Sequence, residues 1–234
     1  MTHVFRFFLP DAAPGEPGQE RALSAVDARR AERVLRLRAG EPVEVADARG
    51  RVLAATMLEG GRVALGEVRC EPTPPAPLVV RLALTGPRAD TAVEKLVELG
   101  VEEIGPLETA LKRRETRTDR WQRIAAAAAA QAKRPRVPRI AACISLPHAL
   151  APGAVLLSHE DPDGTFDAAL ERAGRPLALL VGPESGFAPE EHAAARAAGV
   201  PIATLGDIVL RTETAAIAAA VLALDRLGAL QPRK

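Results

Sequence analysis

The chain has 234 residues, of which 47% are hydrophobic, so it can form one large or two modest domains with substantial cores. Its formal net charge is only +1 and its aromatic content 3%. Cys70 and Cys143 match no metal or redox spacing, the first residues lack a signal-peptide pattern, and the longest apolar run, 215–224, is too short to span a bilayer. We therefore expect a soluble, cytoplasmic protein with no membrane partner.

The first part of the chain predicts a small β domain. Short β-like runs cover 42–50, 51–59 and 62–70, and one helix is predicted over 27–37. Four prolines then follow within 70–80, a density that neither a helix nor a central strand tolerates. This segment predicts a linker, preceded by a small β-barrel or sheet.

Strands and helices alternate after the linker. Strands are predicted over 78–85, 101–108, 139–146, 154–160, 177–182 and 201–206, and helices over 89–100, 118–133, 165–174, 188–199 and 212–228. In the first of these helices Val93, Leu96 and Val97 share one face, and Gly100 ends it. The alternation predicts an α/β fold with a largely parallel sheet covered by helices on both faces.

Two loops at the carboxyl ends of predicted strands are candidates for a binding site. The first lies in "LLVGPESGFAPEEH" (179–192), where glycine and proline end an apolar strand before a helix begins. The second is 205–214, after the strand over 201–206. Because one helix separates the two strands, we expect them to be neighbours in the sheet and their loops to converge. A plain strand-to-helix turn is the alternative.

The spacing within the first loop excludes several established motifs. A phosphate-binding P-loop requires Lys-Ser or Lys-Thr after its last glycine, whereas Phe187 and Ala188 follow Gly186. The sequence "GPESGF" lacks the three glycines of a dinucleotide fingerprint, and Pro183 stands where a serine-hydrolase elbow has glycine. The four histidines have no ligand spacing, so we expect no metal site.

Basic residues concentrate in three short segments. Fifteen of the 31 lysines and arginines lie in 29–38, 112–123 and 133–139. Such clustering lets a nearly neutral protein present a phosphate-binding face, although each cluster alone is also typical of a solvated helix. A polyanion partner and a merely solvated surface both remain open on this pattern.

Several motifs recur together in one known family. The C-terminal signature of that family is similar to "LLVGPESGF", a following "PEE" and "TLGDIVLRTETAA". Its preceding segments are similar to "EKLVELGVEEIGPL", "DRWQRI" and "AAAQAKRPRVPRI", and its front domain to "FRFFL" and "VLRLRAGEPVEVADARG". The chain thus resembles, over nearly its whole length, the bacterial 16S ribosomal RNA uridine-N3 methyltransferases, the RsmE family of the SPOUT superfamily. Ser185 departs from the usual glycine, and the basic residues often found before the first helix are reduced to Arg88.

The resemblance implies S-adenosylmethionine-dependent methylation of uracil N3, forming 3-methyluridine at a specific position in 16S ribosomal RNA of the small subunit. It implies a PUA-like RNA-binding β domain over 1–72 and a SPOUT methyltransferase domain over 73–234, with a mostly parallel sheet, a deep trefoil knot and a homodimer. Two alternatives remain: a SPOUT RNA methyltransferase with a different target nucleotide, and a non-catalytic RNA-binding ribosome-assembly protein.

Site residues are carried over position by position. S-adenosyl-L-methionine is expected to contact Leu157, Ser158, Val181, Gly182, Pro183, Glu184, Gly186, Leu205, Gly206, Ile208, Leu210 and Thr214. The predicted catalytic residues are Arg211, which would stabilise charge on the uracil oxygens, and Glu213, as positioning group or base. RNA contacts are expected from Arg6, Arg29, Arg30, Arg36, Arg38, Lys112, Arg113 and Arg134.

Overall fold

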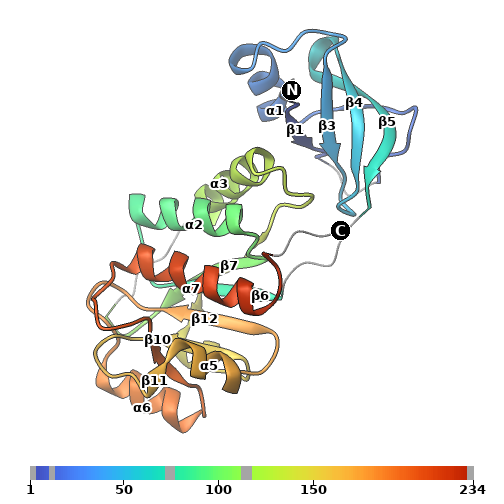
Figure 1. Cartoon of the computed structure of the whole chain (residues 1–234). Helices are drawn as coiled ribbons and strands as arrows, with labels where there is room; N and C mark the ends of the chain where they lie inside the picture. The colour runs from blue at the N-terminus through green and yellow to red at the C-terminus, as the bar shows by residue number, and fades with distance from the viewer. Residues whose placement is uncertain (1–3, 11–13, 72–76, 112–117, 231–234) are drawn as a thin grey trace. The chain divides into compact units, whose positions relative to one another are not determined.

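A computed structural model describes residues 4–10, 14–71, 77–111 and 118–230 of the chain. The chain forms two compact units, drawn from blue to red in Figure 1. Unit 1 comprises Met1–Pro74 with Ala129–Val137, and unit 2 comprises Pro75–Ala128 with Pro138–Lys234. The inclusion of 129–137 in unit 1 was not indicated by the sequence, and the predicted division at residue 72 falls outside the described residues.

Unit 1 is built on a five-stranded sheet. Its strands are β1 (Arg6–Phe8), β2 (Glu20–Ala22), β3 (Pro42–Ala46), β4 (Val52–Leu58) and β5 (Arg62–Cys70). Their order is β1-β3-β4-β5-β2, parallel between β1 and β3 and antiparallel elsewhere. The buried core includes Phe7, Val45, Leu53, Met57 and Val63. Among the described residues no pairing joins β1 to β2, so closure into a PUA-like barrel stays a prediction.

The predicted helix of unit 1 begins earlier than its sequence pattern indicates. Ser24 caps α1 (Ala25–Arg29), because its Oγ accepts a hydrogen bond from the backbone N–H of Asp27 at 3.1 Å. The chain continues as the π-helical turn η1 (Arg30–Val34), while η2 (Glu59–Gly61) is a single turn between β4 and β5. Basic side chains therefore occur at the end of α1, at Arg29, and at Arg30 and Arg33 of the following turn.

A buried carboxylate holds the turn between β3 and β4. Asp47 Oδ1 accepts hydrogen bonds from the backbone N–H groups of Arg49 at 2.9 Å and Arg51 at 3.0 Å, and Oδ2 accepts from Arg51 Nε at 2.9 Å and from the Gly15 N–H at 3.2 Å. Burial raises the pKa of Asp47, but the hydrogen bonds from Arg51 and Gly15 outweigh it and leave that pKa below its ordinary value. The ionised carboxylate thus stabilises the fold of unit 1.

Unit 2 contains a parallel eight-stranded sheet. Its strands are β6 (Leu78–Leu82), β7 (Glu103–Glu108), β8 (Arg139–Ile140), β9 (Ile144–Ser145), β10 (Ala154–Leu157), β11 (Gly164–Thr165), β12 (Leu177–Val181) and β13 (Ile202–Thr204). The order is β11-β13-β10-β12-β6-β7-β8, and β9 also pairs with β7. The described pairings in this unit are all parallel, which confirms the predicted sheet type.

Helices cover both faces of this sheet. They are α2 (Pro87–Leu99), α3 (Thr118–Gln131), α4 (Leu146–Ala149), α5 (Phe166–Arg172), α6 (Pro189–Ala197) and α7 (Thr212–Arg226). Figure 1 shows α2 and α7 on one side of the strands and α5 and α6 on the other. Val93, Leu96 and Val97 of α2 are buried as predicted, and Gly100 ends the helix in the left-handed conformation, φ 103°. None of the helices described in full or in part is long and apolar enough to cross a membrane.

Two strand predictions were wrong in detail. β12 and β13 are not neighbours, because β10 lies between them and pairs with both. All four residues of β10 are buried and apolar, so this strand is suited to an interior position with a partner on each edge. The run over 139–146 is not one strand but two short ones, β8 and β9, separated by three residues outside the sheet.

Candidate functional site

A cavity of about 340 Å³ opens at the carboxyl edge of the sheet in unit 2. Its walls are the segments that follow β10, β12 and β13, and Arg88 at the start of α2 adds to them. The two predicted loops therefore converge although their strands are not adjacent. The volume lies in the range of small-molecule sites, and the carboxyl edge is where open parallel sheets bind ligands.

Most of the predicted cofactor residues line this cavity. They are Leu157, Ser158, Val181, Gly182, Pro183, Glu184, Gly186, Leu205, Ile208 and Leu210. The predicted residues Gly206 and Thr214 do not line it, and Ser185 is exposed outside it. Of the two predicted catalytic residues, Arg211 lines the cavity and Glu213 does not.

The first wall is the tight loop after β12. Its turn closes with a hydrogen bond from the Gly186 N–H to the Pro183 carbonyl at 3.0 Å, and Gly186 has φ +72°, which favours glycine. A Cβ on Gly182 would lie 2.8 Å from Phe187 Cε2, so the Phe187 ring rests directly on the Gly182 backbone. Glycine at both positions therefore lets the chain turn sharply beside the cavity.

The second wall is the segment after β13. Thr204 Oγ1 accepts a hydrogen bond from the Gly206 N–H at 3.3 Å and donates to the Gly206 carbonyl at 2.8 Å, which fixes the turn. Ile208 and Val209 follow with 79% and 70% of their surfaces exposed, although both line the cavity. Arg211 is the N-cap residue of α7, so its exposed guanidinium stands at the mouth of the cavity.

The third wall follows β10 and includes residues that the sequence did not assign. Ser158 Oγ donates to Glu160 Oε2 at 3.0 Å, and both residues line the cavity. His192 of α6 lies behind them, with Nε2 at 2.9 Å from Ser158 Oγ. Leu157 and Ser158 were predicted from the resemblance, whereas Glu160 and His192 carried no motif that would have identified them.

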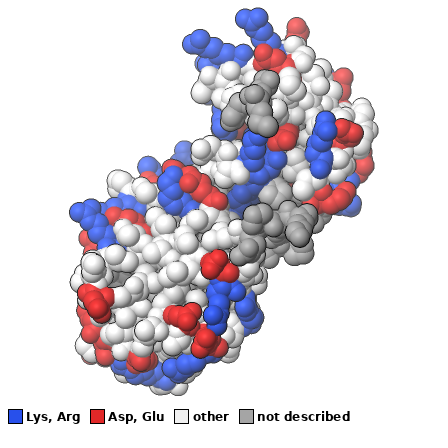
Figure 2. Space-filling model, in the orientation of Figure 1, with Lys and Arg blue, Asp and Glu red and all other residues white. Residues whose placement is uncertain are grey.

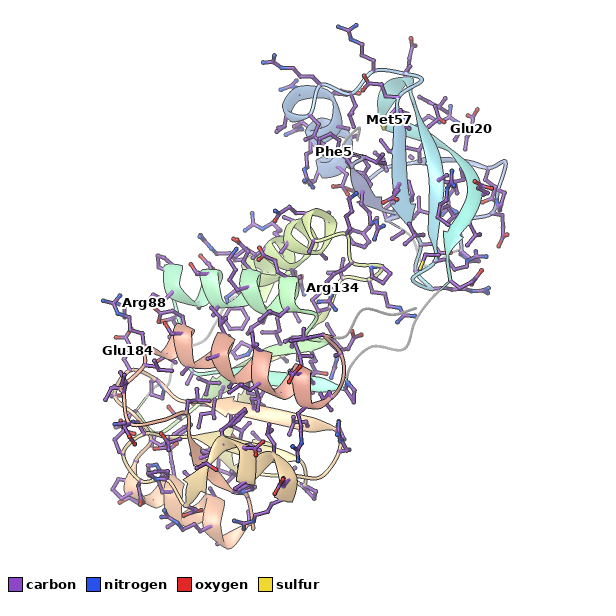
Figure 3. The ribbon with its side chains drawn as sticks, in the orientation of Figure 1. Phe5, Glu20, Met57, Arg88, Arg134 and Glu184 are labelled. Atoms are coloured by element: carbon purple, nitrogen blue, oxygen red, sulfur yellow. The ribbon has the colours of Figure 1, made fainter. Side chains whose placement is uncertain are left out.

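Charged side chains meet where α2 and α7 begin. Arg88 donates a hydrogen bond to Glu184, and Figure 3 shows the two side chains beside one another. Arg88 Nε also lies 3.9 Å from Glu213 Oε1. Glu213 Oε2 is buried without a hydrogen-bond partner, which makes it an acceptor available to a neighbouring donor. Arg88 could have been found from the sequence, because its loop follows β6 at the same edge of the parallel sheet.

The predicted RNA contacts gather mainly in unit 1. Arg29, Arg36 and Arg38 are exposed and Arg30 is half-buried along α1, η1 and the segment that follows, and Figure 2 shows basic side chains projecting there. Arg6 of β1 is paired with Glu44 at 2.8 Å, and Arg134 is half-buried after α3. Lys112 and Arg113 lie outside the described residues. The structure thus brings together the arginines of 29–38 but not the whole predicted set.

No group of three or more His, Cys, Asp or Glu side chains in the described part of the chain could hold a metal ion. The cavity is instead lined by glycine backbone, aliphatic side chains and a few polar groups that include Ser158, Glu160 and Arg211. Such a mixture is typical of a site for a small organic molecule with apolar and hydrogen-bonding parts.

Comparisons with known proteins agree with this arrangement. The sequence model of the RNA methyltransferase domain matches residues 73–224. The ribosomal RNA small subunit methyltransferase E of Mycobacterium bovis is 30% identical over 254 residues, which cover 98% of this chain and 94% of that protein. The chain belongs to the RNA methyltransferase family.

Solved structures of methyltransferases are similar to this chain over most of its length. The ribosomal RNA small subunit methyltransferase E of Neisseria gonorrhoeae, bound to S-adenosylmethionine, is 28% identical, with a TM-score of 0.79 and coverage of 96% of this chain and 98% of that one. A methyltransferase of Legionella pneumophila in complex with S-adenosylmethionine is 25% identical, with a TM-score of 0.81 and the same coverage.

Proposed function

We propose that the chain is an S-adenosylmethionine-dependent methyltransferase that converts one uridine of 16S ribosomal RNA, in the small subunit, to 3-methyluridine. The observation that carries this proposal is the single cavity in which the loops after β12 and β13 meet. Membership of the RNA methyltransferase family and the similarity to ribosomal RNA small subunit methyltransferase E support it. An RNA substrate of this kind agrees with the cytoplasmic location that the sequence predicts.

The cavity fits S-adenosylmethionine in size and chemistry. Gly182 and Gly186 keep the wall free of side chains, so that backbone N–H and carbonyl groups can face the edge of an adenine ring. Leu157, Leu205 and Leu210 provide apolar surface for its faces. The bound cofactor supplies an electrophilic methyl group on its sulfonium, and the protein supplies orientation.

Arg211 and its neighbours act on the uracil. Uracil N3 gives its proton to solvent water when it accepts the methyl group, and negative charge develops on the uracil oxygens while the proton leaves. The exposed guanidinium of Arg211 at the cavity mouth stabilises that charge. Glu213 does not line the cavity, and its contact with Arg88 favours the positioning role over the role of base. In this role Glu213 orients Arg88, a second cation at the mouth.

RNA recognition rests on the basic residues of unit 1. Uracil N3 is hydrogen-bonded in a base pair, so the target must be unpaired or splayed out before it reaches the cavity. With an aromatic content of 3%, the chain has few side chains on which bases could stack. Phosphate contacts from the arginines of 29–38 therefore contribute more of the RNA affinity. We assign residues 1–72 to a PUA-like RNA-binding domain and 73–234 to a SPOUT domain with a trefoil knot.

A second copy of the chain completes the site. Ile208 and Val209 are among the most exposed apolar side chains and line the cavity, and Leu222 of α7 is 51% exposed. Figure 2 shows a broad area over α7 with few charged side chains. Exposed apolar surface of this kind is typical of a protein interface, and a homodimer that buries it would also close one side of the cavity.

Nucleoside mass spectrometry tests the proposed function. Small-subunit RNA from a deletion strain should lack 3-methyluridine, and the chain supplied in trans should restore it, whereas an Arg211→Ala variant should not. If the deletion strain keeps 3-methyluridine and loses a different methylated nucleoside, the chain is an RNA methyltransferase with a different target nucleotide. Calorimetry separates the non-catalytic alternative, because a binding-only protein need not retain affinity for S-adenosylmethionine.

A further inference from the structure

Behind the cavity, a buried histidine is linked to an exposed carboxylate through one serine hydroxyl. Ser158 Oγ donates to Glu160 Oε2 at 3.0 Å, and His192 Nε2 lies 2.9 Å from Ser158 Oγ. Ser158 is 7% exposed and His192 4%, whereas Glu160 is exposed. Burial of two polar side chains is costly without hydrogen bonds, so these contacts explain how they are tolerated beside the cavity.

The direction of these hydrogen bonds follows from the number of protons. A serine hydroxyl carries one proton, which Ser158 gives to Glu160, so the imidazole of His192 must donate from Nε2. His192 Nδ1 lies 3.2 Å from the carbonyl oxygen of Ala188. With a proton on Nε2, the ring is joined to the carboxylate of Glu160 through the hydroxyl of Ser158.

His192 supports a second wall of the cavity as well. Its ring packs edge-on against Phe187, with the ring centroids 6.0 Å apart and the planes at 80°. Phe187 precedes the N-cap residue of α6 and His192 is the fourth residue of that helix, so the pair forms a hydrophobic staple. One imidazole therefore fixes the loop after β10 through Ser158 and the loop after β12 through Phe187.

The carboxylate of Glu160 lies against Gly186 of the loop after β12. A Cβ on Gly186 would lie 3.0 Å from Glu160 Oε1 and 3.1 Å from Oε2, and Oε2 also accepts the hydrogen bond from Ser158. A carboxylate held in this way suits a ligand that donates hydrogen bonds, and acidic side chains commonly accept from the ribose hydroxyls of bound nucleotides.

We propose that Glu160 accepts hydrogen bonds from the ribose hydroxyls of the bound nucleoside cofactor, and that His192, acting through Ser158, is its positioning residue. The inference rests on the proposed function, because it takes the cavity as the S-adenosylmethionine site. The α-ammonium group of the same cofactor is also a hydrogen-bond donor, so the experiment must separate the two ends of the ligand.

Calorimetry on the full-length protein separates them with three ligands: S-adenosylhomocysteine, its 2′,3′-dideoxy analogue, and 5′-methylthioadenosine, which lacks the amino-acid group. Glu160→Gln should weaken binding of S-adenosylhomocysteine and 5′-methylthioadenosine by about tenfold or more, as for loss of a charge-assisted hydrogen bond. Its affinity for the dideoxy analogue should match that of the wild type. A loss confined to S-adenosylhomocysteine would place Glu160 on the amino-acid end and overturn the proposal.

Substitutions at Ser158 and His192 test the positioning role. Ser158→Ala and His192→Leu should each weaken binding of S-adenosylhomocysteine about threefold to tenfold, as expected for loss of a hydrogen bond that positions Glu160 without touching the ligand, and leave binding of the dideoxy analogue unaffected. Ser158→Thr keeps the hydroxyl and should restore affinity. Ser145→Ala is the matched control, because Ser145 Oγ makes a 2.7 Å contact with His148 Nδ1 that is exposed and away from the cavity.

The remaining outcomes distinguish the two proposals. The positioning role would be rejected if Ser158→Ala bound S-adenosylhomocysteine with unchanged affinity. It would also be rejected if this variant lost affinity equally for S-adenosylhomocysteine and for its dideoxy analogue. Unchanged affinity in Glu160→Gln would reject the ribose contact while wild-type binding still supports the cofactor site. A wild-type protein that binds none of the three ligands would reject the proposed function itself.

Discussion

Replacing Gly182 by alanine tests the close packing of the loop after β12. The new Cβ would lie 2.8 Å from Phe187 Cε2 and 3.0 Å from Cδ2, closer than the roughly 3.5–4.0 Å of favourable carbon contacts. Phe187 is 7% exposed and backed by His192, so its ring has little room to move away. Overpacking of this kind costs about 1–3 kcal/mol. For a chain of this length, that cost lowers Tm by about 2–12 °C.

Thermal unfolding and calorimetry with S-adenosylmethionine measure both consequences. Because Phe187 lines the cavity, a displaced ring should weaken ligand binding as well as lower Tm. Gly164→Ala is the control, since a Cβ there meets nothing within 4 Å. The double variant Gly182→Ala/Phe187→Leu should recover part of the lost Tm, because the smaller side chain leaves room for the methyl group. Wild-type Tm and affinity in Gly182→Ala alone would refute the packing argument.

Three further outcomes are expected. Arg211→Lys keeps the positive charge but loses the planar set of guanidinium N–H donors. In a methyl-transfer assay on small-subunit RNA, kcat should therefore fall about tenfold or more while cofactor affinity is retained. A normal rate would reject the assigned role. RNA affinity should weaken steeply between about 50 and 200 mM salt in filter binding, and a flat profile would contradict recognition through phosphates. Asp47→Asn should lower Tm at neutral pH. Loss of a hydrogen bond to a charged group reduces the free energy of unfolding by about 1.5–3 kcal/mol. The folded-state pKa of Asp47 is depressed, so its stabilisation is full above about pH 4 and fades as pH falls further. The Tm difference between wild type and Asp47→Asn should therefore shrink in acid, and a difference independent of pH would contradict this assignment.

Most strands and helices of unit 2 could be read from the sequence because they have strong local patterns, whereas the short elements α4 and β11 were not predicted. The apolar face of α2 ends at Gly100, which needs only neighbouring residues to define it. The tight loop after β12 was equally visible, since glycine and proline follow a buried run at 177–181. Local chemistry fixed these features, and the structure confirms them.

The neighbours of each strand could not be read in the same way. Hydrophobic patterns show that β10, β12 and β13 are strands, but the insertion of β10 between the other two depends on packing across the whole sheet. Glu160 and His192 were missed for a related reason, because each meets a segment distant in the chain: Glu160 lies against Gly186, and His192 contacts Ser158.

The position of β13 has a consequence for how the protein is made. This strand follows the other described strands along the chain, yet it pairs with β10 on one edge and β11 on the other. The order β11-β13-β10 can therefore form only after residues 202–204 have left the ribosome. A nascent chain that ends before residue 202 has only part of the pocket, because the lining residues within 203–212 and Ala215 are still missing from it.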